Sequence, residues 1–142
     1  MKHEVLSLRN RKVILGVSGS ISAYKSVELL RLLVKEGAKV HVVMSINATK
    51  FITPLTFEAL SGNRVYYQVF DRNSSLSMEH IRLAESADLL LIAPATAGVI
   101  GKMANGIADD ALSNLFILAR KCRPFGGLQH LSEKNNMPNS FF

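Results

Sequence analysis

The chain has 142 residues, 48% of them hydrophobic, which suits one globular domain with a substantial buried core. Its formal net charge is +6, yet the basic residues are scattered and not interleaved with aromatic residues, so we expect no nucleic-acid partner. The single cysteine, Cys122, excludes an intrachain disulfide and a cysteine metal cluster, and the four histidines lack the spacing of metal ligands, so no metal site is expected.

The first expected strand is the apolar run 13–17, which breaks into a turn of small residues at 18–22. A near-continuous apolar run suits a strand that is buried on both faces. Gly19 allows a sharp turn, so the backbone N–H groups around Ser20 and Ile21 would point outward at a helix N-terminus, where anions bind. A turn without any ligand explains the same residues equally well, because such turns are common in parallel α/β proteins.

The glycine pattern narrows the kind of ligand. A dinucleotide fingerprint requires Gly-x-Gly-x-x-Gly and an acidic residue after the second strand. This chain has only Gly16 and Gly19 there, and its second strand is followed by Ser45, Ile46 and Asn47. No Gly-Lys-Ser/Thr follows at the required spacing, which argues against a nucleoside triphosphate held with magnesium. A mononucleotide with one phosphate fits the turn better.

The rest of the chain alternates between expected helices and strands. Apolar residues at three- and four-residue spacing predict a helix that begins at a Ser22 cap and ends at Gly37, and Thr53 followed by Pro54 is typical of another helix start. The further expected elements are a strand over 39–44, a helix from 54 to a stop at 61–62, a strand over 65–70, a polar loop over 71–77, a helix over 78–85, a strand over 89–93, a helix over 99–103 and a helix from 109–110 to about 121.

This alternation predicts an α/β fold of three layers, a doubly wound parallel sheet of the Rossmann-like or flavodoxin-like kind. Ligands of such folds bind at the carboxyl ends of the strands, and Gly19, Ser45 and Thr96 all follow such ends. We therefore expect these residues to line one crevice. The simpler roles are a turn for Ser45 and a helix cap for Thr96.

Three segments carry a specific similarity. Residues 16–25 contain Gly-x-x-Gly-Ser-Ile-Ser-Ala-Tyr-Lys, residues 78–84 contain Met-Glu-His-Ile-x-Leu-Ala, and residues 93–97 read Ala-Pro-Ala-Thr-Ala, followed at 101–110 by Gly-Lys-Met-Ala-Asn-Gly-Ile-Ala-Asp-Asp. In order and spacing they resemble the phosphate loop, the active-site histidine segment and the second flavin segment of the homo-oligomeric flavin-containing cysteine decarboxylases. The resemblance extends from about Lys12 to about Arg120.

The resemblance implies FMN as the cofactor, bound between subunits of a homo-trimer or a dodecamer, and a small acyl-cysteine as the substrate. The residues that it implies for binding FMN are Gly19, Ser20, Ile21, Ser45, Thr96 and Ala97. His80 would act in proton transfer; without the resemblance it would be interpreted as a helix-start residue bonded to backbone. The most similar branch of the family decarboxylates 4′-phosphopantothenoylcysteine to 4′-phosphopantetheine in coenzyme A biosynthesis.

The chain departs from the family at two places. Gly98 and Val99 stand where the family's second flavin segment has asparagine and threonine, so an amide and a hydroxyl are replaced. Residues 122–142 read as irregular, where the family has a further strand with Pro-Ala-Met-Asn and a cysteine-bearing flap. We expect a leader over 1–11, an FMN-binding domain over 12–121, incomplete at its C-terminal end, and a non-family tail over 122–142 that arises by truncation or a frame shift. Impaired turnover follows from both departures.

Two other functions fit the same residues. One is a non-catalytic FMN-binding or regulatory flavoprotein. The other is an enzyme like the flavin prenyltransferases, which share the fold and bind FMN as a substrate.

The sequence also bears on the cellular compartment. The first twelve residues carry Glu4 and too short an apolar stretch for a signal peptide. Nowhere do about 18 apolar residues run together, as a membrane-spanning helix would need. We expect a cytoplasmic protein without a membrane partner.

Overall fold

A computed structural model of the chain describes residues 8–68, 75–119 and 123–124. Most of the expected leader over 1–11 and nearly all of the expected tail over 122–142 lie outside the described residues. The last residues of the expected strand over 65–70 and of the helix expected to reach about 121 also lie outside them.

The core of the fold is a parallel sheet with the strand order β2-β1-β3-β4. The strands are β1 (Lys12–Val17), β2 (Lys39–Met44), β3 (Leu89–Ile92) and β4 (Arg123–Pro124). β1 is central and pairs along its whole length with β2 and over four residues with β3. Beyond β2, Tyr66 forms an isolated parallel bridge to Val43, where the sequence predicts a strand over 65–70. The chain therefore winds outward in both directions from β1, as a doubly wound fold requires.

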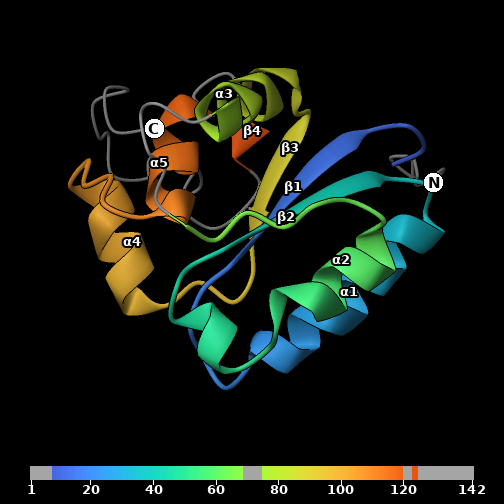
Figure 1. Ribbon diagram of the computed structural model, residues 1–142, viewed down its shortest axis with the longest axis horizontal. Helices are drawn as coiled ribbons and strands as arrows, with labels where there is room; N and C mark the ends of the chain where they lie inside the picture. Colours follow the sequence, from blue (N-terminus) through green and yellow to red (C-terminus); the bar gives the residue numbers. More distant parts are fainter. Residues whose placement is uncertain (1–7, 69–74, 120–122, 125–142) are drawn as a thin grey trace, which may run out of the picture.

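Helices cover both faces of this sheet (Figure 1). They are α1 (Ala23–Lys35), the 3-10 turn η1 (Ala48–Lys50), α2 (Pro54–Ser61), α3 (Ser75–Ser86), α4 (Ala97–Ala104) and α5 (Ala111–Leu118). Within the described ranges, none of these helices combines the length and the apolar character that crossing a membrane demands.

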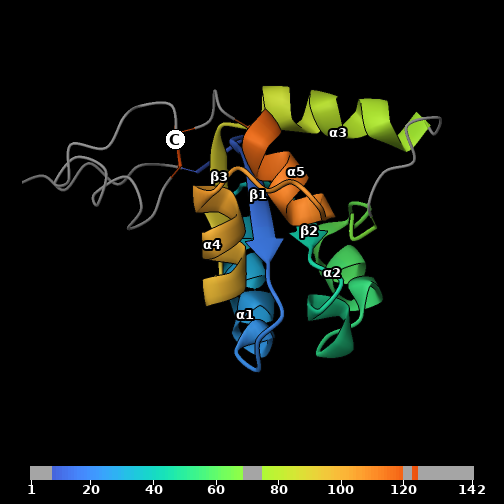
Figure 2. The ribbon, with the colours of Figure 1, turned by 90° about the vertical axis from the view of Figure 1, so that its left-hand side faces the viewer.

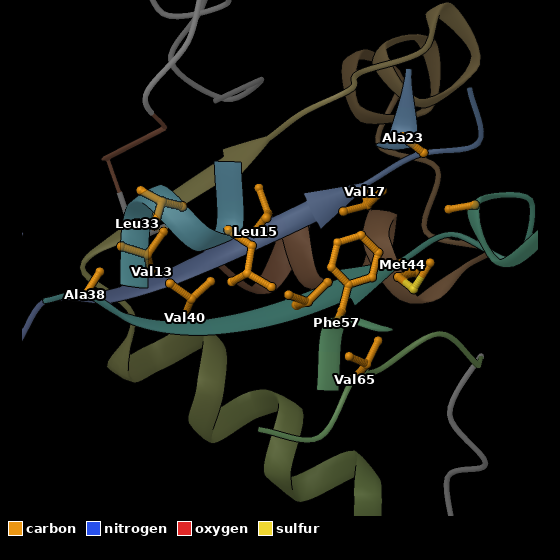
Figure 3. Packing of buried hydrophobic residues seen from close by; sticks show 13 residues of the cluster. Val13, Leu15, Val17, Ala23, Leu33, Ala38, Val40, Met44, Phe57 and Val65 are labelled. Carbon is orange, nitrogen blue, oxygen red and sulfur yellow. The ribbon is translucent and has the colours of Figure 1, made fainter. Parts of the chain in front are cut away.

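Side-chain alternation along the strands divides the interior into two cores. Val13, Leu15 and Val17 of β1 pack with α1 and α2, whereas Ile14 packs with residues of α3, α4 and α5. Figure 3 shows the first of these cores, in which the ring of Phe57 from α2 lies against the sheet near Met44. Burial on both faces explains why the first strand reads as a continuous apolar run.

Most helices begin and end near the residues that the sequence predicts, but the capping contacts and one helix start differ from the prediction. Ser22 precedes α1 as expected, but its side chain makes no capping hydrogen bond. Thr53 and Pro54 begin α2, and Gly62 ends it with a left-handed φ of 71°, a conformation that glycine adopts without strain. α3 begins at Ser75, inside the stretch 71–77 that the sequence predicts to be a loop, so that prediction was wrong for residues 75–77. A serine-rich stretch favours a loop by local preference, and α3 overrides that preference here.

Candidate functional site

The turn after β1 is held against the turn after β2 by a close approach at Gly19. A Cβ atom at this position would lie 2.5 Å from Cβ of Asn47 and 2.9 Å from its carbonyl carbon. No side chain fits at such distances, so the contact requires glycine. The first two strand-end turns are therefore in direct contact.

The same turn presents backbone N–H groups at the start of α1. The N–H of Ser22 donates to Oγ of Ser20 at 3.2 Å, and the N–H of Ala23 donates to the carbonyl oxygen of Ser20 at 2.9 Å. Within the described part of the chain, the N–H groups of Ser20 and Ile21 have no acceptor. These two donors lie at the positive end of a 13-residue helix, the arrangement at which proteins bind anions such as phosphate.

Ser45 joins the end of β2 to the end of β1. Its N–H donates to the carbonyl oxygen of Val17 at 2.9 Å, and its Oγ accepts the N–H of Ala48 at 3.2 Å. The side chain is buried. Ser45 thus shapes the turn that meets Gly19, and its hydroxyl proton is left to donate to a ligand.

Ser18 ties the turn after β1 to the turn after β3. Its buried Oγ donates to the carbonyl oxygen of Pro94 and accepts the N–H of Thr96 at 3.0 Å. At the end of the first turn of α1, Oγ of Ser26 donates to the carbonyl oxygen of Ala93 at 2.7 Å. Sequence reasoning missed both serines as site residues. The only signal was the run of small residues after the apolar strand.

Thr96 begins α4 and presents a second helix start to the same edge of the sheet. Its Oγ1 accepts the N–H of Val99 at 3.3 Å, so Thr96 is the N-cap residue of α4 and Ala97 its first residue. Gly98 follows, and no described atom lies within 4 Å of the position that its Cβ would take. The departure from the family at Gly98 therefore leaves open space beside the turn.

His80 is not among the residues gathered at this edge. It lies on α3, is 1% exposed, and its ring is 4.3 Å from the ring of Tyr66, measured between centroids, at an interplanar angle of 67°. The backbone of Tyr66 bonds to Val42 and Met44 of β2. Figures 1 and 2 both place α3 at the opposite end of the molecule from the turns that lead into α1 and α4. The structure thus brings the predicted FMN residues together and leaves His80 apart from them, buried against Tyr66.

Asp109 and Asp110 form a clamp between α4 and α5. Nζ of Lys102 lies 2.9 Å from Oδ1 of Asp109 and 3.1 Å from Oδ2 of Asp110, and these hydrogen bonds raise the pKa of Lys102. Asp110 also forms a capping box with Ser113. Burial works against ionisation of Asp110, but the hydrogen bonds from Ser113 and Lys102 outweigh it and lower the pKa of Asp110.

The strand-end turns of a doubly wound sheet, joined by Ser18 and Gly19, define an anion-binding α/β protein of the kind that holds a nucleotide cofactor. The Flavoprotein family model matches residues 1–125, so the chain belongs to the Flavoprotein family.

Among curated relatives, the coenzyme A biosynthesis bifunctional protein CoaBC of Bacillus subtilis is 49% identical over 112 residues, which are 79% of this chain and 28% of that protein. Among solved structures, the FMN-dependent cysteine decarboxylase SpaF has a TM-score of 0.71 at 30% identity, covering 82% of this chain and 67% of that one. A PPC decarboxylase mutant complexed with pantothenoylaminoethenethiol has a TM-score of 0.60 at 28% identity, with coverage of 76% and 60%. The chain spans little more than a quarter of the length of the coenzyme A protein that it matches.

Proposed function

We propose that this chain binds FMN at the three joined turns and acts in the decarboxylation of 4′-phosphopantothenoylcysteine. The observation that carries the proposal is the pair of unused N–H groups, on Ser20 and Ile21, in a turn fixed by Gly19. The family of the chain and its similarity to CoaBC and to FMN-dependent cysteine decarboxylases support the choice of cofactor and reaction.

The residues present fit a flavin mononucleotide. The N–H groups of Ser20 and Ile21 would hold its phosphate, helped by the positive end of α1. The hydroxyl of Ser45 and the start of α4 at Thr96 and Ala97 would contact the rest of the cofactor from the neighbouring strand ends. Because these groups come from turns that are bonded to one another, they are positioned before the cofactor arrives.

The chemistry divides between the cofactor and the chain. Bound FMN would supply a two-electron oxidation of the cysteine thiol, giving a β-thioketo acid that loses carbon dioxide easily, and would return the two electrons to the resulting enethiol. The role proposed for His80 is proton transfer to or from the substrate at a site shared between subunits, because within its own subunit α3 lies far from the turns that lead into α1 and α4 (Figures 1 and 2). The packing of its ring against Tyr66 fixes the orientation of the imidazole.

The missing amide at Gly98 supports a narrower version of the proposal, in which the chain binds FMN and turns over slowly or not at all. An assembly of identical subunits, a homo-trimer or a dodecamer, is the oligomeric state that we propose with it. The proposed location is the cytoplasm.

The test is to purify the full chain, titrate it with FMN, and measure carbon dioxide release from 4′-phosphopantothenoylcysteine together with the mass in solution. Yellow protein that releases carbon dioxide supports the full proposal. FMN binding without release supports the non-catalytic flavoprotein, and a prenylated flavin formed from a prenyl phosphate would support the prenyltransferase-like alternative. A chain that stays colourless and monomeric with excess FMN overturns the proposal.

A further inference from the structure

A second concave feature lies between α3 and the amino-terminal half of the sheet. It is an open depression of about 330 Å³, and its lining includes Lys12, His41, Tyr66, Glu79, Arg82 and Leu83. Lys12 begins β1, whose other end leads into the turn at Ser18. Five residue steps along a strand span about 16 Å, so the Lys12 end of the depression lies far from the strand-end site.

Several polar side chains line this depression. Lys12 and His41 alternate with residues of the first core, so their side chains share the face on which Ile14 and Val43 contact the second core. Opposite them, α3 presents Arg82. Lys12 and His41 are half-buried and Arg82 is exposed, so their donors are accessible to a ligand that enters the depression.

The two cations in the lining, Lys12 and Arg82, outnumber its one carboxylate, Glu79. In the described ranges, neither the ammonium group of Lys12 nor the guanidinium group of Arg82 forms an ion pair. Asp88, the nearby acid, accepts the backbone N–H of Lys12 at 2.8 Å and pairs with Arg11 at 3.9 Å. Two cations therefore face a space large enough for a small molecule.

The carboxylate in the lining, Glu79, already has a partner. The hydroxyl of Tyr66 donates to its Oε2 at 3.2 Å. Burial, and then the charge and hydrogen bond of Glu79, raise the pKa of Tyr66, so the phenol stays protonated and keeps this bond. Burial, and then the charge of Lys12, lower the pKa of His41, so its neutral ring offers one N–H donor.

We propose that this depression is a binding site for a small anion, in which a phosphate or carboxylate group lies between Lys12 and Arg82 and accepts a third hydrogen bond from His41. Tyr66 and Leu83 form the less polar wall against which the remainder of the ligand rests. Charge-assisted hydrogen bonds to a lysine and an arginine are among the strongest that a protein makes to such groups.

The experiment uses the full chain, with its FMN where it binds FMN, and two probes, inorganic phosphate and acetate. Ring resonances of His41 are followed by NMR during each titration. We expect them to shift saturably with at least one probe, and the pKa of His41 to rise, because the bound anion offsets the charge of Lys12. Whether phosphate or acetate binds more tightly identifies the head group.

Two variants and two matched controls test the assignment. Lys12→Met and Arg82→Gln should each weaken binding at least about fivefold. Lys35→Met and Arg31→Gln remove the same charges from exposed positions on α1 and should leave binding unchanged. Arg82 is exposed, so its variant remains informative if Lys12→Met does not fold. The proposal would be overturned if the His41 resonances do not move, or if the control variants weaken anion binding as much as the test variants do. It would also be overturned if phosphate shifts only the resonances of Ser20 and Ile21.

Discussion

Replacement of Gly19 by alanine tests whether the strand-end turns act as one binding unit. The new methyl group would lie 2.5 Å from Cβ of Asn47 and 2.9 Å from its backbone carbon, whereas nonbonded carbons prefer about 3.5–4.0 Å. One turn must therefore move by about 1 Å, and overpacking of this kind costs about 1–3 kcal/mol of unfolding free energy.

The same movement displaces the N–H groups of Ser20 and Ile21 from their positions at the start of α1. Loss of charge-assisted hydrogen bonds to a phosphate costs about 1.5–3 kcal/mol, which corresponds to roughly a 10- to 150-fold weaker affinity for FMN. Flavin fluorescence measures the affinity, and urea denaturation measures the stability.

Gly101→Ala is the matched control for this experiment. Gly101 lies within α4, and no described atom lies within 4 Å of its Cβ position. The control should gain about 0.5–1 kcal/mol of stability from helix propensity and keep its affinity for FMN. If Gly19→Ala binds FMN as tightly as the parent chain at unchanged stability, the reasoning about the joined turns is refuted.

Three further results are expected. Gly98→Asn adds an amide in open space, so the rate of carbon dioxide release should rise while the affinity for FMN stays unchanged. An equal rise in Gly98→Ala would show that the amide is not the cause. Ser18→Ala leaves the part-buried N–H of Thr96 without its acceptor and removes one of the two donors to the carbonyl oxygen of Pro94, so it should cost about 1–3 kcal/mol in urea denaturation and weaken FMN binding. Unchanged values for both would contradict the linking role. Asp110→Ala removes a capping box and should cost about 1 kcal/mol at pH 7. The pKa of Asp110 in the folded chain lies below its ordinary 3.8, so ionised Asp110 stabilises the fold fully above pH 3.8. This stabilisation is lost as the pH falls through the pKa of the folded state. The stability difference between variant and parent should therefore shrink in acid.

Much of the sheet could be predicted from short stretches of sequence. The run 13–17 is apolar because β1 is covered on both faces, and that information is local. The ends of β1, β2 and β3 were marked by small or hydroxyl residues, because turns there admit few other side chains. The gathering of Gly19, Ser45 and Thr96 then followed from parallel pairing alone.

The contacts that fix the site could not be predicted, because they join residues far apart in the chain. Ser18 and Thr96 are separated by 78 residues, and no local pattern indicates that a hydroxyl will bridge them. The approach of Gly19 to Asn47 likewise depends on how two turns pack. The segment that contains His80 was recognised by its similarity to a family. The contact of His80 with Tyr66 depends on the tertiary packing of α3, which the sequence does not reveal.

The central position of β1 has a consequence for how the molecule opens. β1 packs with one core through Val13, Leu15 and Val17 and with the other through Ile14, and it is bonded to strands on both sides. Neither half can detach without exposing one side of this strand, so its amide hydrogens should be among the slowest in the chain to exchange with solvent. The turn at Ser18 to Ile21 directly follows the end of that strand. We therefore expect the N–H groups of Ser20 and Ile21 to be attached to one of the least fluctuating parts of the molecule, although the turn itself is at the surface.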